Sequence, residues 1–246
     1  MIFEELELPN IPKRSRLHHL EPIAICTPYV EGLISYICRL AEIHCVSPRI
    51  LIQKEILPSF RESYSLGVGE IYALKKDEDT LLVSSLPKPP YRKNPNEYGL
   101  LAWQYLEGLK SLTLRLDLQA LIIPEAGRAL SGMIERELGR DFRAWCPKCF
   151  QTWRDAEQPI YEPLLWSIAS VTVCPCHCNL LQTRCPHCQK KQRPLTARTY
   201  VARCSQCSSW LGVHMDEASE LKVLTTTEFE KQLRIAEQAM KFLNLD

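Results

Sequence analysis

The sequence carries almost no net charge. Its 30 Lys and Arg residues nearly balance 29 Asp and Glu residues, and the formal net charge is +1. A chain this close to neutrality has no global field that would draw it to nucleic acid or to acidic lipid. Any electrostatic binding surface therefore has to be local.

Targeting and membrane signals are also missing. The first ten residues, MIFEELELPN, are acidic and lack the basic start and the apolar segment of a secretory signal. No run of about eighteen apolar residues occurs, which excludes a transmembrane helix. We expect a cytoplasmic protein that makes no membrane contact.

Catalytic signatures are absent as well. The sequence contains no Walker loop, no dinucleotide-binding fingerprint, no G-x-S-x-G elbow and no H-E-x-x-H motif. The acidic pairs Glu4/Glu5 and Asp77/Asp79 lie in polar segments, which indicates solvated side chains. The sequence predicts that the protein is not an enzyme.

Cysteine, in contrast, is abundant. The 246 residues include twelve cysteines, within a composition of 46% apolar and 24% charged residues that is typical of soluble globular proteins. This length allows two or three compact units. In a reducing cytosol, cysteines rarely form disulfides and are better candidates for metal ligands, provided that their spacing suits a metal.

Four pairs of candidate ligands share one spacing. Two ligands separated by two residues can fold back through a tight turn and reach one ion at about 2.3 Å, and a second pair completes a tetrahedron. The four pairs are CPKC (Cys146, Cys149), CPCH (Cys174, His177), CPHC (Cys185, Cys188) and CSQC (Cys204, Cys207).

These pairs predict two zinc sites. Fifteen residues separate Cys188 from Cys204, which gives C-x2-C-x15-C-x2-C, a spacing typical of zinc sites. The other two pairs combine across 24 residues into a site of three cysteines and one histidine. Eight ligands fill two closed tetrahedra and leave no open position for water, so we expect two structural zinc ions. The alternative is a set of buried free cysteines.

The ligands within CPCHC are open to alternatives. Cys176 and Cys178 compete with Cys174 and His177, and only the shared two-residue gap favours the latter pair. His187 lies inside the CPHC pair, where we expect it at the surface or beside the metal ligands.

The cysteine-rich region has a local positive charge. No acidic residue occurs between Glu162 and Asp216. Seven thiolates bound to two Zn²⁺ would leave about three of its six positive charges uncompensated. A solvated face explains this bias as well as a contact with RNA or DNA phosphates does. The candidate nucleic-acid-binding residues are Arg184, Lys190, Lys191, Arg193, Arg198 and Arg203.

The N-terminal part reads as helical. Apolar spacing predicts a helix over Gly32 to His44, and Ser47 followed by Pro48 predicts the cap and first turn of a second helix through Ile56. So short a connection is compatible with a helix-turn-helix that would place Arg49 and Lys54 in a DNA groove. With only two basic residues there, a plain helical hairpin is favoured.

Further helices follow. A proline-rich stretch from Ser85 to Gly99 predicts an exposed connection. Helices are predicted over Leu100 to Leu112, with Trp103, Leu106 and Leu109 in the core, and over Ala126 to Leu138. Thr227 and Glu230 form a capping-box pattern before a helix that is expected to pack on the chain's own core through Phe229, Leu233, Ala236, Met240 and Leu243.

The predicted fold is mainly α with small zinc-ribbon or zinc-finger modules. We divide the chain into an N-terminal helical domain with a candidate helix-turn-helix (1–90), a helical segment (91–144), tandem zinc-binding modules (145–212) and a C-terminal amphipathic helix (213–246).

Several segments together resemble the TniQ family, the target-selection adaptors of Tn7-like transposons. The stretch from Ser15 to Ser47 is similar to the N-terminal signature of that family, and Leu106 to Ile123 is similar to its next helical segment. The order WCPKC, YEPLLW, VCPCH and CPHC also resembles the family pattern, and the likeness reaches about residue 210. The chain has Glu31-Gly32 and Ser35-Tyr36 where the family often has Glu-Ser and Ser-Trp, and both changes keep the helical pattern.

The resemblance implies a noncatalytic adaptor. Such a protein links a target-recognition complex, such as a CRISPR RNA-guided one, to an AAA+ ATPase regulator of the TnsC type. Zinc would hold its surfaces in shape, and the basic residues would contact guide RNA or target DNA. The chain is short beside TnsD-type members, which carry a long C-terminal DNA-reading extension, and we expect a short member to work with another target reader. The alternative is a stand-alone zinc-containing, sequence-specific DNA-binding protein.

Overall fold

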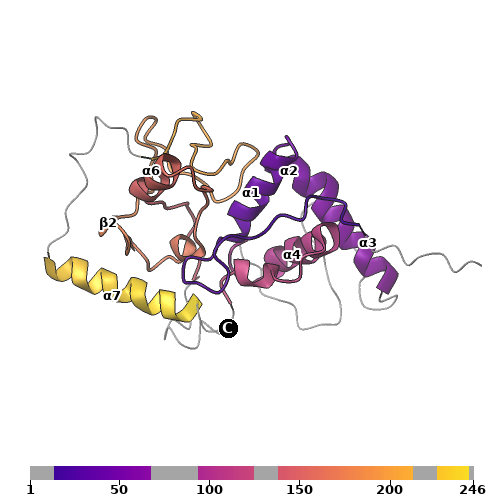
Figure 1. Ribbon diagram of the computed structural model, residues 1–246, viewed down its shortest axis with the longest axis horizontal. Helices are drawn as coiled ribbons and strands as arrows, with labels where there is room; N and C mark the ends of the chain where they lie inside the picture. The colour runs from indigo at the N-terminus through magenta and orange to yellow at the C-terminus, as the bar shows by residue number, and fades with distance from the viewer. Residues whose placement is uncertain (1–13, 68–93, 125–137, 213–225, 244–246) are drawn as a thin grey trace, which may run out of the picture.

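The computed structural model describes residues 14–67, 94–124, 138–212 and 226–243, and in these parts the protein is mainly helical with little sheet (Figure 1). Two lobes lie side by side. Helices α1 to α4 form one lobe, and α6, the cysteine-rich loops and α7 form the other. This architecture confirms the predicted fold class.

The first predicted helix is confirmed. Helix α1, Leu33–Ile43, begins after Gly32 and ends before His44, as the apolar spacing indicates. Eight of its 11 residues are buried. It is therefore a central helix, and it lies where the two lobes meet.

The second helix is longer than the sequence predicts. It begins as predicted, with the Ser47 hydroxyl accepting a hydrogen bond from the Ile50 N–H at 3.3 Å. The predicted end at Ile56 is wrong, because α2 (Pro48–Leu51) continues through the π-helical η1 (Ile52–Ile56) into α3 (Leu57–Gly67).

A π-turn explains how this helix passes a proline. Pro58 has no N–H to donate, and its ring would clash with a carbonyl one turn earlier in a regular α-helix. The Leu57 N–H bonds to the Ile52 carbonyl, five residues back, so the register advances by one residue just before the proline.

Helix α4, Leu100–Thr113, matches its prediction and packs across η1 and α3. Leu106 and Leu109 are buried as expected. Trp103 is only half-buried, and its ring meets that of Phe60 edge-on at 5.1 Å. A short 3-10 helix, η2 (Leu118–Leu121), follows. The predicted helix over 126–138 lies outside the described residues except for Leu138, which is not helical.

The described end of the proline-rich stretch is buried, not exposed as predicted. Asn94, Asn96 and Glu97 are all nearly inaccessible. Their side chains satisfy neighbouring backbone groups, since the Glu97 carboxylate accepts from the N–H groups of Leu138 and Gly139 at 3.2 Å. Residues 85–93 lie outside the described parts of the chain.

The second lobe is built on aromatic side chains between short elements. Its elements are α6 (Pro147–Asp155), the 3-10 helix η3 (Leu164–Ser167) and a hairpin of β1 (Val173–Cys174) with β2 (Asn179–Leu180). Phe150 is fully buried at the centre, with ring centroids of Trp153, Trp166 and Trp210 at 6.2, 5.5 and 6.1 Å. This core is shared by the loops that carry the cysteines.

Backbone and side-chain bonds join the two lobes. The Gly32 N–H donates to the Glu162 carbonyl at 3.0 Å, and the Leu164 N–H donates to the Val30 carbonyl at 2.7 Å. The Glu162 carboxylate in turn forms an ion pair with Arg143, whose side chain is 4% exposed. The start of α1 is thereby fixed to the cysteine-rich lobe.

The C-terminal helix α7, Thr226–Leu243, packs on β1 and η3, which confirms its predicted docking on the chain's own core. It begins one residue before the predicted cap Thr227. Ala236 is fully buried, and the rest of the predicted face, including Met240, is half-buried. The side-chain amide oxygen of Gln232 accepts a hydrogen bond from the Thr172 hydroxyl at 2.6 Å.

No helix in the described segments is long and apolar enough to cross a membrane. The division of the chain into four domains stays a prediction.

Candidate metal centres

The first group of candidate ligands lies between α6 and the β1–β2 hairpin. Cys146 caps α6, because its sulfur accepts the Cys149 N–H at 3.4 Å and Pro147 occupies the first helical position. This cap places both cysteines at the helix start. Cys174 ends β1, opposite Asn179, and His177 lies in the loop that joins the strands. We call Cys146, Cys149, Cys174 and His177 the first cluster.

Distances within the first cluster are short. All four ligand atoms lie within 4.8 Å of one another. The Cys149 and Cys174 sulfurs are 3.6 Å apart, and the His177 Nδ1 is 3.2 Å from the Cys149 sulfur. The other ring nitrogen, Nε2, lies 3.4 Å from the Thr152 hydroxyl, a contact that fixes the ring orientation.

The second group, Cys185, Cys188, Cys204 and Cys207, forms the second cluster, again with all ligand atoms within 4.8 Å of one another. Sulfur pairs Cys185/Cys207 and Cys188/Cys204 are 3.7 and 3.6 Å apart. Each pair of ligands comes from its own tight turn, and each turn is closed by an isolated antiparallel bridge, Arg184 with Lys191 and Arg203 with Trp210.

Three of the four pairs use the same turn. The residue after the second ligand has a positive φ in each case: 48° at Cys178, 58° at Gln189 and 61° at Ser208. In the second cluster, the N–H groups of Gln189 and Ser208 donate to the carbonyls of Cys185 and Cys204 at 2.9 Å. The two-residue gap in the sequence therefore corresponds to a repeated backbone conformation that turns both ligands toward one point.

Both clusters have the dimensions of a tetrahedral metal site. Two sulfurs about 2.3 Å from a tetrahedral ion lie about 3.8 Å apart. The observed sulfur separations of 3.6 to 3.7 Å agree with this value. Backbone N–H groups also point at the sulfur of Cys204, from Gln206 at 3.4 Å and from Cys207 at 3.5 Å, and such bonds stabilise a thiolate.

Crowded thiols in these clusters do not ionise equally. Hydrogen bonding from Cys149 lowers the pKa of Cys146 to about 4, while the same contact raises the pKa of Cys149. Burial raises the pKa of Cys185 to about 12, and the Ser209 hydroxyl and backbone lower the pKa of Cys207 to about 6. A cation placed between the sulfurs would stabilise their charged forms together.

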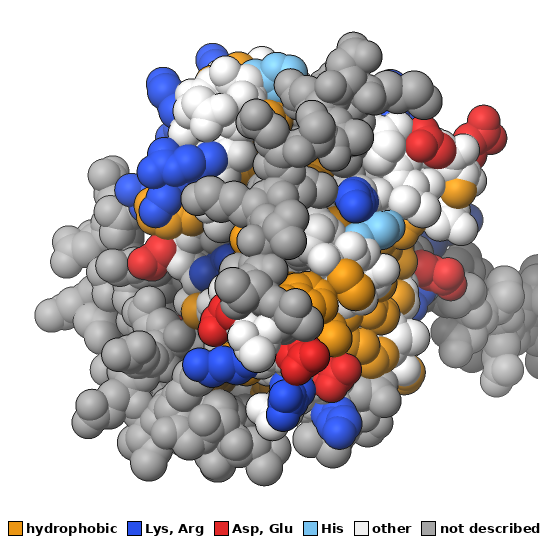
Figure 2. Space-filling model, turned by 90° about the vertical axis from the view of Figure 1, so that its left-hand side faces the viewer, with side chains coloured by type: hydrophobic (Ala, Val, Ile, Leu, Met, Phe, Trp, Pro, Cys, Tyr) orange, Lys and Arg blue, Asp and Glu red, His pale blue; other side chains and the backbone are white. Residues whose placement is uncertain are grey.

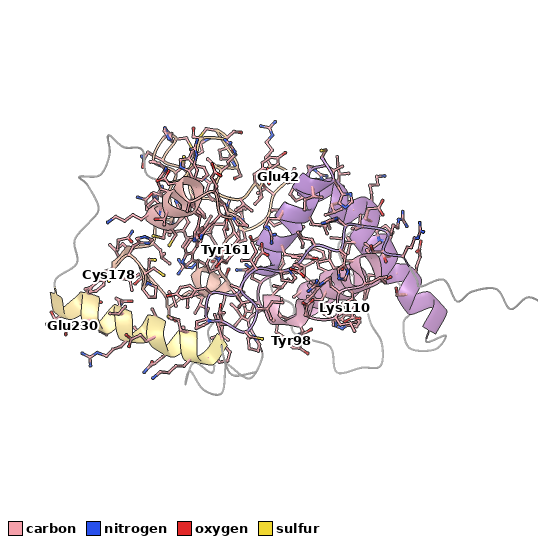
Figure 3. The ribbon with its side chains drawn as sticks, viewed as in Figure 1. Glu42, Tyr98, Lys110, Tyr161, Cys178 and Glu230 are labelled. Carbon is pink, nitrogen blue, oxygen red and sulfur yellow. The ribbon has the colours of Figure 1, made fainter. Side chains whose placement is uncertain are left out.

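The geometry favours the predicted ligands over their competitors. Cys178 is exposed, and its sulfur contacts the Pro175 carbonyl at 3.7 Å. Figure 3 shows Cys178 on the loop above α7. Cys176 is also exposed, although it interacts with the thiols of Cys149 and Cys174. His187 is exposed, as expected.

All six predicted nucleic-acid-binding residues are exposed, around the turns of the second cluster. The guanidinium of Arg184 donates to the Gln189 carbonyl. The Lys191 ammonium and the Arg193 guanidinium lie over the Phe142 ring, 4.9 and 5.9 Å from its centroid. Figure 2 shows several Lys and Arg side chains gathered at the upper left of one face, with few acidic ones among them. We call Arg184, Lys190, Lys191, Arg193, Arg198 and Arg203 the basic patch.

Tyr200 was missed by the sequence reasoning. It is 37% exposed and lies between Arg198 and Arg203 in the sequence. An exposed aromatic ring within a basic segment can stack on a nucleic-acid base. Its position among arginines was the available signal.

The candidate helix-turn-helix presents a mixed surface. Arg49 and Lys54 are exposed, and so is Ile50, at 51%. Glu55, next in the chain, forms an ion pair with Arg16 at 3.0 Å. The structure places these residues in the helical lobe, apart from both clusters.

The fold and the site define a class: a small, mainly helical protein with two four-residue clusters of metal-binding geometry. Within that class, the family model TniQ matches residues 22–181, and the chain belongs to this family, whose members are associated with transposition. The match includes the first cluster and ends before Cys185, so the second cluster and α7 lie beyond it. No curated protein matches the chain significantly.

Proposed function

We propose that the two clusters hold two structural zinc ions. Cys146, Cys149, Cys174 and His177 would bind one ion, and Cys185, Cys188, Cys204 and Cys207 the other. Zinc supplies a cation that lets crowded thiols ionise together and fixes loops with little regular structure. In small zinc modules, this binding stabilises the fold by about 10 kcal/mol or more. Each ion would have four protein ligands, which supports a structural role.

We further propose that the protein is a noncatalytic target-selection adaptor in transposition. It would link a target-recognition complex, of the CRISPR RNA-guided kind, to an AAA+ ATPase regulator of the TnsC type. The observation that carries this proposal is the TniQ match over residues 22–181, which spans both lobes. Bonds across the lobes, such as Gly32 to Glu162, support a rigid unit suited to bridging two partners.

The basic patch is proposed as the contact with guide RNA or target DNA. Six exposed cations surround the second cluster, and Tyr200 adds an exposed ring. Phosphates pair with such cations, and the resulting affinity falls with salt. Because the chain is nearly neutral overall, it would bind nucleic acid weakly, and this contact would add to its contacts with protein partners.

The decisive experiment measures binding of labelled, zinc-loaded protein to a TnsC-type ATPase assembled on DNA with nucleotide, with bare DNA as the control. The adaptor proposal predicts binding that requires the assembled ATPase. Equal binding to bare DNA would contradict it. A purified protein that cleaves or joins DNA by itself would also contradict it.

A stand-alone DNA reader is the second candidate, and the exposed row of Arg49, Ile50 and Lys54 supports it. A reader prefers one duplex sequence and loses affinity steeply as salt increases. Charge reversal at Lys54 would then abolish sequence preference, whereas reversal at Lys191 and Arg193 would weaken only the contact of an adaptor. Comparing the two variants separates the candidates.

A further inference from the structure

The tip of the β1–β2 hairpin carries more potential metal ligands than one site uses. Strand β1 ends at Cys174 and β2 begins at Asn179, so Pro175 to Cys178 form the connecting loop. Three consecutive loop residues, Cys176, His177 and Cys178, have side chains that can bind zinc. One of them, His177, lies in the first cluster.

The two flanking cysteines differ in their surroundings. The sulfur of Cys178 contacts the Pro175 carbonyl. The thiol of Cys176 instead interacts with those of Cys149 and Cys174 and with the hydroxyl of Tyr29. Cys176 lies outside the four mutually close ligand atoms, but its thiol interacts with the thiols of two of these ligands and it is next to His177 in the loop.

The other three ligands of the first cluster have fixed positions. Cys146 and Cys149 are held by the start of α6, and Cys174 by the β1–β2 pairing. His177, in contrast, lies on irregular backbone, just before a residue with positive φ. The fourth coordination position therefore depends on a short loop, in which the exposed Cys176 is next to His177.

We propose that Cys176 is a reserve ligand of the first cluster, able to take the fourth position when His177 is removed. The donor set would change from three thiolates and an imidazole to four thiolates, both of which zinc accepts. As its sulfur binds, Cys176 releases its thiol proton to solvent. This inference rests on the proposed zinc binding.

The second cluster provides a contrast. In CSQC, the residue that corresponds to Cys176 is Gln206, which supplies no thiol. Loss of Cys207 thus has no replacement from the same turn, and Cys207→Ala is a matched control for His177→Ala.

The test measures zinc per full-length chain by elemental analysis and the absorption spectrum after Co²⁺ substitution. Wild type binds two ions. His177→Ala keeps two and shows a stronger sulfur-to-cobalt charge-transfer band, because four thiolates bind the ion. His177→Ala/Cys176→Ser keeps one, His177→Ala/Cys178→Ser keeps two, and Cys207→Ala keeps one.

Alkylation of the metal-loaded proteins gives a second measurement. Iodoacetamide modifies Cys176 in wild type, and the expected result is protection of Cys176 in His177→Ala. The reserve-ligand proposal would be overturned if His177→Ala bound only one ion. It would also be overturned if His177→Ala/Cys176→Ser and His177→Ala/Cys178→Ser bound the same number of ions. A wild type without metal, or Cys149→Ser with two ions, would instead show that the zinc proposal itself has failed.

Discussion

The Asn96 side chain caps helix α1 from a distant loop: its Oδ1 accepts a hydrogen bond from the Ile34 N–H at 2.8 Å, across 62 positions in the sequence. The local cap residue, Gly32, has no side chain that could accept this bond. The Nδ2 of Asn96 also donates to the Ser167 hydroxyl at 2.7 Å. One buried amide therefore joins α1 to η3.

Replacing Asn96 by Ala is expected to destabilise the protein by about 1–3 kcal/mol, because a buried N–H loses its acceptor. Urea unfolding measures the change. Ser167→Ala removes one partner of the amide but leaves the cap, so it serves as the control. We expect it to lower the free energy of unfolding by less than Asn96→Ala does. Equal losses in the two variants would contradict the capping role.

Gly108→Ala tests the crossing of α4 and η1. A Cβ at this position would lie 2.3 Å from the Ile56 carbonyl oxygen. Gly to Ala in an open helix stabilises by about 1 kcal/mol, but overpacking of this kind costs about 1–3 kcal/mol. We expect a lower melting temperature. Ser111→Ala in the same helix is the control, and a stabilised Gly108→Ala would show that the crossing is looser than described.

Loss of a second-cluster ligand is expected to act locally. Cys185→Ser removes a fully buried sulfur, so zinc content falls to one ion per chain. Hydrogen exchange measured by mass spectrometry is expected to increase around residues 185–211, while α1 and α4 keep their protection. Unchanged zinc content would refute the ligand assignment, and uniform loss of protection would contradict the predicted module boundary.

The carboxylate of Asp117 provides a pH test. A hydrogen bond from Arg115 lowers its pKa below the ordinary 3.8. A depressed folded-state pKa contributes stability above the ordinary value, and this contribution is lost as pH falls through the folded-state pKa. Since Asp117 is partly exposed, we expect only about 0.2–1 kcal/mol.

Nuclear magnetic resonance titration of the Asp117 carboxylate measures this shift. Arg115→Gln is expected to return the pKa toward its ordinary value. Glu21→Gln removes a more distant partner of Arg115, at 3.8 Å, and is expected to change the Asp117 pKa little. An unchanged pKa in Arg115→Gln would contradict the assigned cause.

The patterns that predicted correctly were local ones. Apolar spacing located α1 and α4. The two-residue gap grouped Cys146, Cys149, Cys174 and His177, whose ligand atoms lie within 4.8 Å of one another, since a short turn fixes where both side chains of a pair point. The features that the sequence did not predict depend on contacts between distant segments or on local helix geometry. Nothing near Asn96 signals that it caps α1, and the rule that ends helices before proline does not foresee the π-turn before Pro58.

Strand β1 supports two features at once. Cys174 belongs to the first cluster, while Val173 and Thr172 lie against α7, whose Met240 also contacts the Tyr29 hydroxyl. Because free energies of binding are reciprocal, any amount by which a bound ion steadies this hairpin also strengthens docking of α7, and docked α7 raises affinity for the ion equally. The C-terminal helix, which lies beyond the family match, would thus tune metal retention in the first cluster.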